Sequence, residues 1–147
     1  MDAPLIGRAV RSVAPPARIK KKSGAQIGDA VLITKPIGNG IAVAARQAGF
    51  LRDKDWDATR AAMLAPNTIG AFLGEEPSVT SLTDVTGFGL LGHAVEVGEA
   101  SGVCVELHLN GLPLLPGVKR AAAAGPAPLL AGSNWGGFQA SMRASGA

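Results

Sequence analysis

The sequence is poor in cysteine, histidine and aromatic residues. It holds one cysteine, Cys104, two histidines and no tyrosine, and aromatic residues make up 4% of its 147 residues. A single cysteine excludes a disulfide framework within the chain, and no Cys/His cluster has the spacing of a zinc site. The core must therefore be built from Ala, Val, Leu and Ile, within a hydrophobic content of 47%.

Long apolar runs are also missing. No stretch approaches the ~20 apolar residues that a membrane span needs. The first 22 residues lack the apolar segment of a secretory signal. We therefore expect a protein of the reducing cytoplasm.

The positive charge is concentrated at the N-terminus. The formal net charge is +3, from 14 basic and 11 acidic residues. Residues 1–22 hold six basic side chains and one acidic one, which leaves 14 − 6 = 8 basic and 11 − 1 = 10 acidic residues elsewhere. A basic tail can contact nucleic acid, but no aromatic residue interleaves with these charges. A solvated leader is the favoured interpretation, and it includes the run Lys20–Lys22.

The hydrophobic pattern predicts both strands and helices. Apolar or alternating runs indicate strands at 29–36, 77–84 and 102–110. Helical spacing and stop signals indicate helices at 41–48, 53–65, 66–73 and 118–124, and another that ends near Ala100. Because a regular βαβ rhythm is absent, we expect an α+β fold, with a mixed sheet and packed helices. From Gly125 onward no period is sustained, and we expect no order there.

The stretch SLTDVTGFGLLGHAVE (81–96) places three glycines where an apolar helix begins. A strand–loop–helix turn presents free backbone N–H groups and a positive dipole end to an anion. Glycines let a ligand approach the backbone closely. One hypothesis therefore places Mg²⁺ at Asp84 and phosphate near Thr86, Gly87 and Gly89. In the alternative, Asp84 caps the helix and the glycines only permit close packing.

Four segments of the chain resemble one enzyme family. LTDVTGFGLLGHAVEVGEASGV is similar to the signature of selenophosphate synthetases, also called selenide, water dikinases. GDAVLITKPIGNG, AMLAPN and LPLLPGV resemble further segments of that family in matching order, so the similarity covers roughly residues 24–125. The related aminoimidazole ribonucleotide (AIR) synthetases have GGGL where this chain has GFGLLGH. Asn39 stands where the family commonly has Thr.

The resemblance implies the C-terminal, AIR-synthase-type domain of an enzyme that makes selenophosphate, AMP and phosphate from ATP, selenide and water. It implies a Mg²⁺ requirement, a homodimer, and an ATP site between two domains. Asp84 would be a metal ligand, and Thr86, Gly87 and Gly89 would face the nucleotide phosphates. Residues 1–24 would be a basic tail or inter-domain connection, residues 25–125 the domain, and residues 126–147 a Gly/Ala/Ser-rich tail.

The chain also departs from that family. The family's N-terminal half carries a reactive Cys or selenocysteine, a catalytic Lys and further metal-binding Asp residues, and none has a counterpart here. The later DPQTSGG strand is missing too. We therefore expect a domain truncated at both ends, with no catalytic residue of its own and little or no synthetase activity alone. The alternative is an inactive fragment that at most binds nucleotide or a partner synthetase subunit.

Three other side chains have a structural and a functional interpretation. Cys104 shares a predicted strand face with Glu106 and His108, but four residues at ~3.3 Å each separate the thiol from the imidazole by about 13 Å. A structural role is favoured for Cys104. His93 is expected on the exposed polar face of its helix, and Lys35 is expected to be solvated rather than bound to phosphate.

Overall fold

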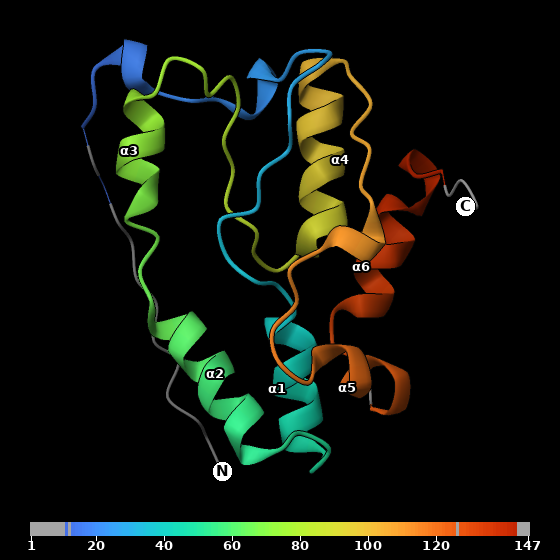
Figure 1. The fold of residues 1–147 in the computed structure, drawn as a ribbon. Coiled ribbons are helices and arrows are strands. Elements are labelled where there is room, and N and C mark those ends of the chain that lie inside the picture. The colour runs from blue at the N-terminus through green and yellow to red at the C-terminus, as the bar shows by residue number, and fades with distance from the viewer. Residues whose placement is uncertain (1–10, 12, 126, 144–147) are drawn as a thin grey trace.

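Six α-helices follow one another in a computed structural model that describes residues 11, 13–125 and 127–143 (Figure 1). They are α1 (Asn39–Gln47), α2 (Asp53–Leu64), α3 (Ile69–Glu75), α4 (Gly89–Ser101), α5 (Val118–Ala124) and α6 (Ala131–Phe138). Four short 3-10 turns accompany them: η1 (Pro16–Arg18), η2 (Lys22–Gly24), η3 (Leu109–Gly111) and η4 (Gln139–Ser141). The five helices predicted from the sequence are confirmed as α1–α5.

Glycines in the left-handed region lie at the ends of several of these helices. Gly38 precedes α1 with a φ of 114°, Gly102 follows α4 with a φ of 67°, and Gly117 precedes α5 with a φ of 78°. Side chains with a Cβ rarely adopt this conformation, so glycine starts or stops a helix there at low cost. These ends of α1, α4 and α5 therefore follow from the positions of the glycines.

The predicted mixed sheet is not confirmed. Among the described residues, pairing is limited to one isolated parallel bridge between Ile37 and Leu114. The Ile37 N–H donates to the carbonyl of Pro113 at 2.8 Å, and the Leu115 N–H donates to the carbonyl of Ile37 at 3.0 Å. Residues 29–36, 78–84 and 103–108 lack regular strand structure. An alternating pattern shows which face of a segment suits burial, but a strand also needs a hydrogen-bonded neighbour.

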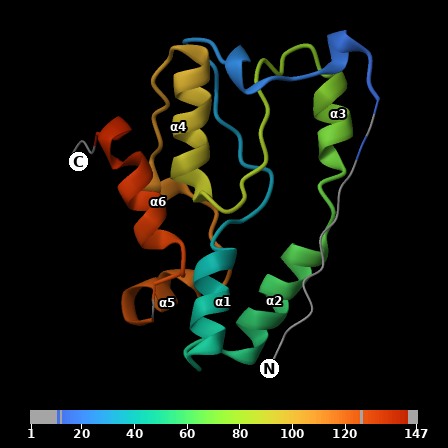
Figure 2. The same cartoon turned by 180° about the vertical axis from the view of Figure 1, so that it is seen from behind.

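A small core lies where α1, α2 and α5 meet. Its buried members are Ala42, Ala45, Leu51, Leu115, Val118 and Ala121. Small side chains let the backbones approach closely, and a Cβ on Gly38 would lie 2.7 Å from a methyl carbon of Val118. Figure 2 shows α1, α2 and α5 gathered at one end of the molecule. The prediction of a core built from small aliphatic residues is confirmed.

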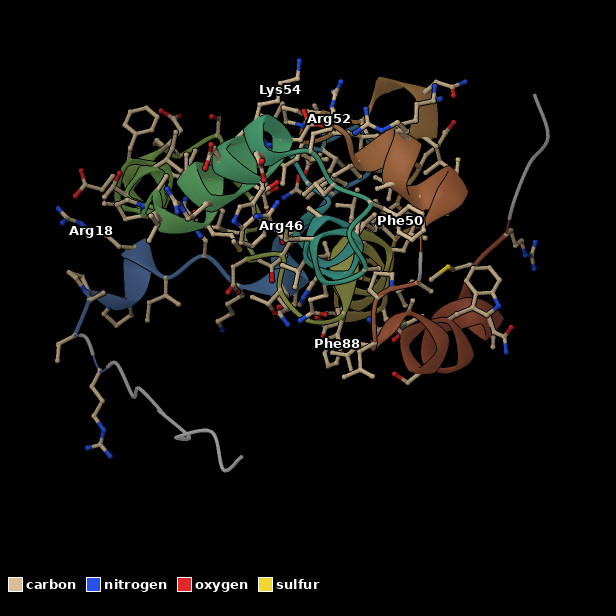
Figure 3. The ribbon with its side chains drawn as sticks, turned by 90° about the horizontal axis from the view of Figure 1, so that it is seen from below. Arg18, Arg46, Phe50, Arg52, Lys54 and Phe88 are labelled. Carbon is tan, nitrogen blue, oxygen red and sulfur yellow. The ribbon has the colours of Figure 1, made fainter. Side chains whose placement is uncertain are left out.

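A buried carboxylate joins α2 to α5 beside this core. Asp55 is 3% exposed and accepts from Arg52 Nε at 2.8 Å and from Arg120 Nη2 at 3.0 Å. The hydrogen bond from Arg52, with that from Arg120, lowers the pKa of the Asp55 carboxyl, although burial opposes the shift. Figure 3 views the molecule from below and labels Arg52, one of these two arginines. Charged groups therefore tie the ends of two core helices.

The second half of the molecule is organised around α4. The turn η2 and helix α6 both pack against α4, and residues 16–24 lie along the same end of the molecule as α3 and α4 (Figure 1). Lys20 Nζ donates to the carbonyl of Glu76, and Lys22 Nζ donates to Glu96 at 2.9 Å. Lys20 and Lys22 are thus docked rather than freely solvated. Residues 1–10 and 12 of the predicted tail lie outside the described residues.

The prediction of no order after Gly125 is wrong for α6 and η4. The Asn134 amide donates to the carbonyl of Gly87 at 2.7 Å, and the rings of Phe138 and Phe88 lie 5.5 Å apart. Glycine weakens the intrinsic helix propensity of this segment, but contacts with another element can outweigh propensity. Residues 126 and 144–147 lie outside the described part of the chain.

Within the described ranges, each helix is too short or too polar to cross a bilayer.

Candidate functional site

The segment from Asp84 to Gly89 forms an exposed turn that leads into α4. The Gly89 N–H donates to the carbonyl of Thr86 at 3.0 Å, and Gly89 itself has a φ of 71°. The N-cap position of α4 is Phe88, where no side-chain hydrogen bond caps the helix. The alternative that Asp84 caps this helix is therefore wrong. The side chain of Asp84 is exposed at the end of the extended segment.

The glycines of this stretch do two different things. A Cβ on Gly92 would lie 2.7 Å from Phe88 Cβ and 2.8 Å from Phe138 Cε2, so Gly92 permits close packing of α4 on α6. A Cβ on Gly87 would meet only Leu130 Cδ1, at 3.9 Å, and one on Gly89 would meet nothing within 4 Å. Gly87 and Gly89 therefore leave open space beside the backbone. Close packing and an open approach coexist within six residues.

His93 is buried, which corrects the prediction of a surface residue. Its side chain is 7% exposed, and Nε2 lies 3.1 Å from the Thr86 backbone nitrogen and 3.2 Å from Thr86 Oγ1. The face of α4 that carries His93 and Glu96 packs against η2 and against the turn that precedes α4. A polar residue on this face is therefore interior. Because the Thr86 N–H and the Thr86 hydroxyl both lie within hydrogen-bond distance of His93 Nε2, the backbone beyond Thr86 is left to face a ligand.

Two residues that hold the loop were missed from the sequence. Asn134 on α6 binds the carbonyl of Gly87, and His93 binds Thr86. Asn134 lies in a Gly-rich stretch without a helical period, so no sequence signal marked it. His93 did carry a signal, because it follows the glycine stretch directly, seven residues after Thr86.

Asp84 fits a Mg²⁺ site as one ligand of several. Mg²⁺ in proteins usually keeps several waters and takes one or two carboxylates together with substrate phosphates. The described residues contain no group of three or more His, Cys, Asp or Glu side chains that could hold a metal ion. An exposed carboxylate beside an open helix N-terminus suits a metal ion that arrives with a phosphate ligand.

Lys35 has its hydrogen-bond partner outside this loop. Its Nζ donates to the carbonyl of Ala65, just after the C-terminus of α2. Lys35 thereby satisfies a carbonyl that the helix leaves without an intrahelical partner. The ammonium of Lys35 thus has a protein partner and is not wholly solvated.

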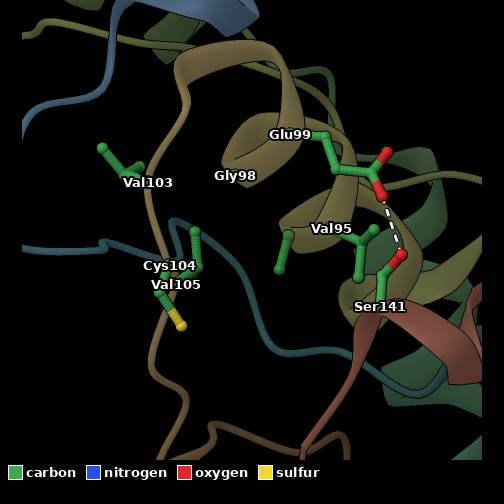
Figure 4. A pocket seen from close by; sticks show the side chains of 8 residues that line it. Val95, Gly98, Glu99, Val103, Cys104, Val105 and Ser141 are labelled. Carbon is green, nitrogen blue, oxygen red and sulfur yellow. Dashed lines mark hydrogen bonds between the residues drawn. The ribbon is translucent and has the colours of Figure 1, made fainter.

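A cavity of about 100 Å³ lies at the opposite end of α4 from Asp84. Figure 4 shows it between Gly98 and Glu99 of α4, Cys104 on the following segment, and Ser141 of η4. Ser141 Oγ donates to Glu99 at 2.7 Å across it. The Cys104 thiol is exposed, and the nearest ionic partner of His108 is Glu106, at 3.3 Å. The cavity is thus separate from the Asp84–Gly89 loop.

The loop, the glycine-bounded helices and the Ile37–Leu114 bridge all lie inside one recognised domain. The family described as AIR synthase related protein, C-terminal domain, matches residues 26–133. The chain belongs to this family.

Several curated relatives of this chain are named selenide, water dikinase. A selenide, water dikinase of Cronobacter sakazakii is 40% identical over 125 residues, which cover 85% of this chain and 36% of the relative. That of Aeromonas salmonicida is 44% identical over 112 residues, covering 76% and 32%, and that of Bordetella bronchiseptica is 39% identical over 137 residues, covering 93% and 40%. The sequence resemblance to selenophosphate synthetases is confirmed. The chain spans between 32% and 40% of the length of these relatives.

Proposed function

We propose that this domain supplies part of a Mg·ATP site for ATP-dependent selenophosphate synthesis. In this proposal Asp84 is one ligand of Mg²⁺, and the turn from Thr86 to Gly89 receives the nucleotide phosphates. The proposal rests on one observation above all: an exposed carboxylate stands beside an open, glycine-lined turn at the start of an uncapped helix.

The chemistry of phosphoryl transfer suits such a partial site. Catalysis of this reaction depends almost entirely on positioning the phosphates and stabilising their charge. Mg²⁺, when bound, neutralises charge on the phosphate oxygens. The chain's own part is to orient the metal through Asp84, and to offer backbone N–H groups and the dipole of α4 to the phosphates.

A second candidate function is nucleotide or partner binding without catalysis. The single carboxylate at the loop favours it, because the described residues offer no cluster of three metal ligands. The two candidates differ in activity and agree in binding. The isolated chain is expected to show no selenide-dependent AMP formation, and AMP formation above background would overturn that expectation.

Thermal melting with Mg·ATP tests the binding that both candidates share. A ligand present at 100 times its Kd stabilises the folded state by about 2.7 kcal/mol. For a chain of this length, that corresponds to a rise in Tm of about 5–11 °C. We expect such a rise for the wild type and none for Asp84→Ala.

Matched controls separate this site from general effects of charge. Asp57 is an exposed aspartate on α2, and its nearest ionic partner is Arg60, at 3.7 Å, so Asp57→Ala should keep the Mg·ATP-induced rise. Mg²⁺ alone and ATP with a chelator should each give a smaller rise than Mg·ATP. An equal Mg·ATP-induced rise in wild type and Asp84→Ala would refute the role of Asp84, and no rise in the wild type would refute the site.

A further inference from the structure

Three side chains and one backbone N–H form a continuous hydrogen-bonded chain behind the Asp84–Gly89 loop. His93 Nε2 lies 3.1 Å from the Thr86 backbone nitrogen, and His93 Nδ1 lies 2.8 Å from Glu96 Oε2. The same Glu96 oxygen lies 2.9 Å from Lys22 Nζ. The chain thus runs from η2 through two residues of α4 to the turn that precedes α4.

The donor at Thr86 indicates which ring nitrogen of His93 accepts. A backbone N–H can only donate, so Nε2 must accept with its lone pair. The proton of the neutral ring then sits on Nδ1, where it donates to Glu96. A second proton on Nε2 would set two donors against each other at 3.1 Å. The geometry therefore favours the tautomer that carries its proton on Nδ1 and accepts at Nε2.

The Lys22 ammonium supports this arrangement from the other side. Its hydrogen bond to Glu96, with a smaller contribution from His93, lowers the pKa of the Glu96 carboxyl against the opposing effect of burial. An ionised Glu96 can only accept, which holds the Nδ1 proton in place. Lys22 is itself fixed, because its carbonyl accepts from Ser81 Oγ at 3.0 Å and from Ser101 Oγ at 2.9 Å.

We propose that His93 is a positioning residue for the phosphate-binding turn. As a neutral acceptor it holds the Thr86 backbone, and thereby gives Gly87–Gly89 the shape that receives nucleotide phosphate. Glu96 and Lys22 set the tautomer that makes this possible. The inference rests on the proposed Mg·ATP function for its purpose, but the clamp on Thr86 is a property of the protein without ligand.

The tautomer is measurable without any nucleotide. Nitrogen NMR of the ¹⁵N-labelled protein at about pH 8, where an imidazole is ordinarily neutral, reports which ring nitrogen carries the proton. The only other histidine, His108, has a side chain that is 83% exposed and serves as an internal reference. We expect the proton of His93 on Nδ1, and that of His108 to follow the preference of a solvated imidazole. A His93 proton on Nε2, or a doubly protonated ring, would overturn the proposal.

Substitutions then test the clamp itself. His93→Gln keeps an acceptor within reach of Thr86, whereas His93→Phe keeps a ring and removes the acceptor. Loss of one such hydrogen bond should speed the exchange of the Thr86 amide about fivefold to tenfold in His93→Phe. His93→Gln should restore most of the protection. A Thr86 amide that exchanges equally fast in wild type and His93→Phe would overturn the proposal.

The link to nucleotide is tested on the same proteins by titration with Mg·ATP. We expect the apparent Kd to rise about fivefold to tenfold in His93→Phe, less in Glu96→Gln, and little in His93→Gln. Glu99→Gln is the matched control, because Glu99 lies on α4 but binds Ser141 instead. Unchanged Mg·ATP affinity in a folded His93→Phe would refute the positioning role.

Failure of the proposed function is distinguishable from failure of this inference. If the wild type shows an Nδ1-protonated His93 and a protected Thr86 amide but no Mg·ATP binding, the Mg·ATP site is refuted and the clamp stands as a structural one. If His93→Phe does not fold, the proposal is still tested by the tautomer of His93 in the wild type and by the Mg·ATP titration of His93→Gln.

Discussion

Replacing Gly92 by alanine tests the closest contact in the site region. The new Cβ would lie 2.7 Å from Phe88 Cβ and 2.8 Å from Phe138 Cε2. Optimal carbon contacts lie at about 3.5–4.0 Å, so α4 and α6 must separate by roughly 1 Å or the rings must turn. Phe88 Cβ is attached directly to the backbone and cannot rotate away. The substitution is therefore expected to loosen the contact between α4 and α6.

The magnitude follows from two opposing contributions. Overpacking of a well-packed contact costs about 1–3 kcal/mol. Alanine in a helix interior gains back about 1 kcal/mol relative to glycine. With a backbone-attached carbon among the clashing atoms, we expect a net destabilisation of about 1–2 kcal/mol. For a chain of this length that is a fall in Tm of about 2–8 °C.

Calorimetry on Gly92→Ala and Gly87→Ala checks this reasoning. A Cβ on Gly87 meets one methyl carbon at an ordinary 3.9 Å, so its Tm should stay within about 2 °C of the wild type. Gly87→Ala should weaken Mg·ATP binding more than Gly92→Ala does, because Gly87 borders the proposed site and Gly92 packs behind it. A Gly92→Ala protein that melts at or above the wild-type temperature would refute the packing role.

Two further predictions concern contacts between elements. Asp55→Asn should lower the Tm, and Asp57→Asn, on the exposed face of α2, should not. Folding lowers the pKa of the Asp55 carboxyl from its ordinary value of 3.8. The carboxylate therefore contributes fully to stability above pH 3.8, and this contribution is lost as the pH falls below that value. Wild-type melts between about pH 3 and pH 6 should therefore show an acid-sensitive step that Asp55→Asn reduces, and an unchanged profile would contradict this. Asn134→Ala should remove the bond to Gly87 and cost about 1 kcal/mol by thermal melting, whereas Ser133→Ala, which loses only a local bond to Leu130, should cost less; equal losses would contradict the tie between α6 and the loop.

The helices were predictable because their signals are local. Gly38, Gly49, Gly102 and Gly117 all have positive φ and mark helix boundaries, and the apolar spacing between them is helical. The near absence of strand pairing in the described residues was not predictable in the same way. Each extended segment shows its own pattern in the sequence, whereas strand pairing depends on which neighbouring segment is present. Residues 102–110 do alternate in sequence, but this alternation alone is not enough to form a strand.

The organisation of the candidate site was only partly predictable from the sequence. Asp84, Thr86, Gly87 and Gly89 are indeed close together, since they are adjacent in sequence. Local sequence could not show that the Thr86 N–H is already bonded, because its partner depends on how α4 turns back on the loop. Nor could it show that a Gly-rich stretch would supply Asn134 from α6, because tertiary contact decided that helix.

The Ile37–Leu114 bridge has a consequence for the order of folding. It joins positions 114 − 37 = 77 apart, and it brings α5 onto α1 to close the core. Closing a flexible loop of that length costs about 4 kcal/mol in chain entropy before any contact forms. Helices α1 and α2 are neighbours in sequence and meet at little entropic cost, whereas bringing α5 onto them carries the cost of closing the whole loop between residues 37 and 114. The small core should therefore be the last part to be sealed during refolding, even though it is among the most deeply buried parts of the finished protein.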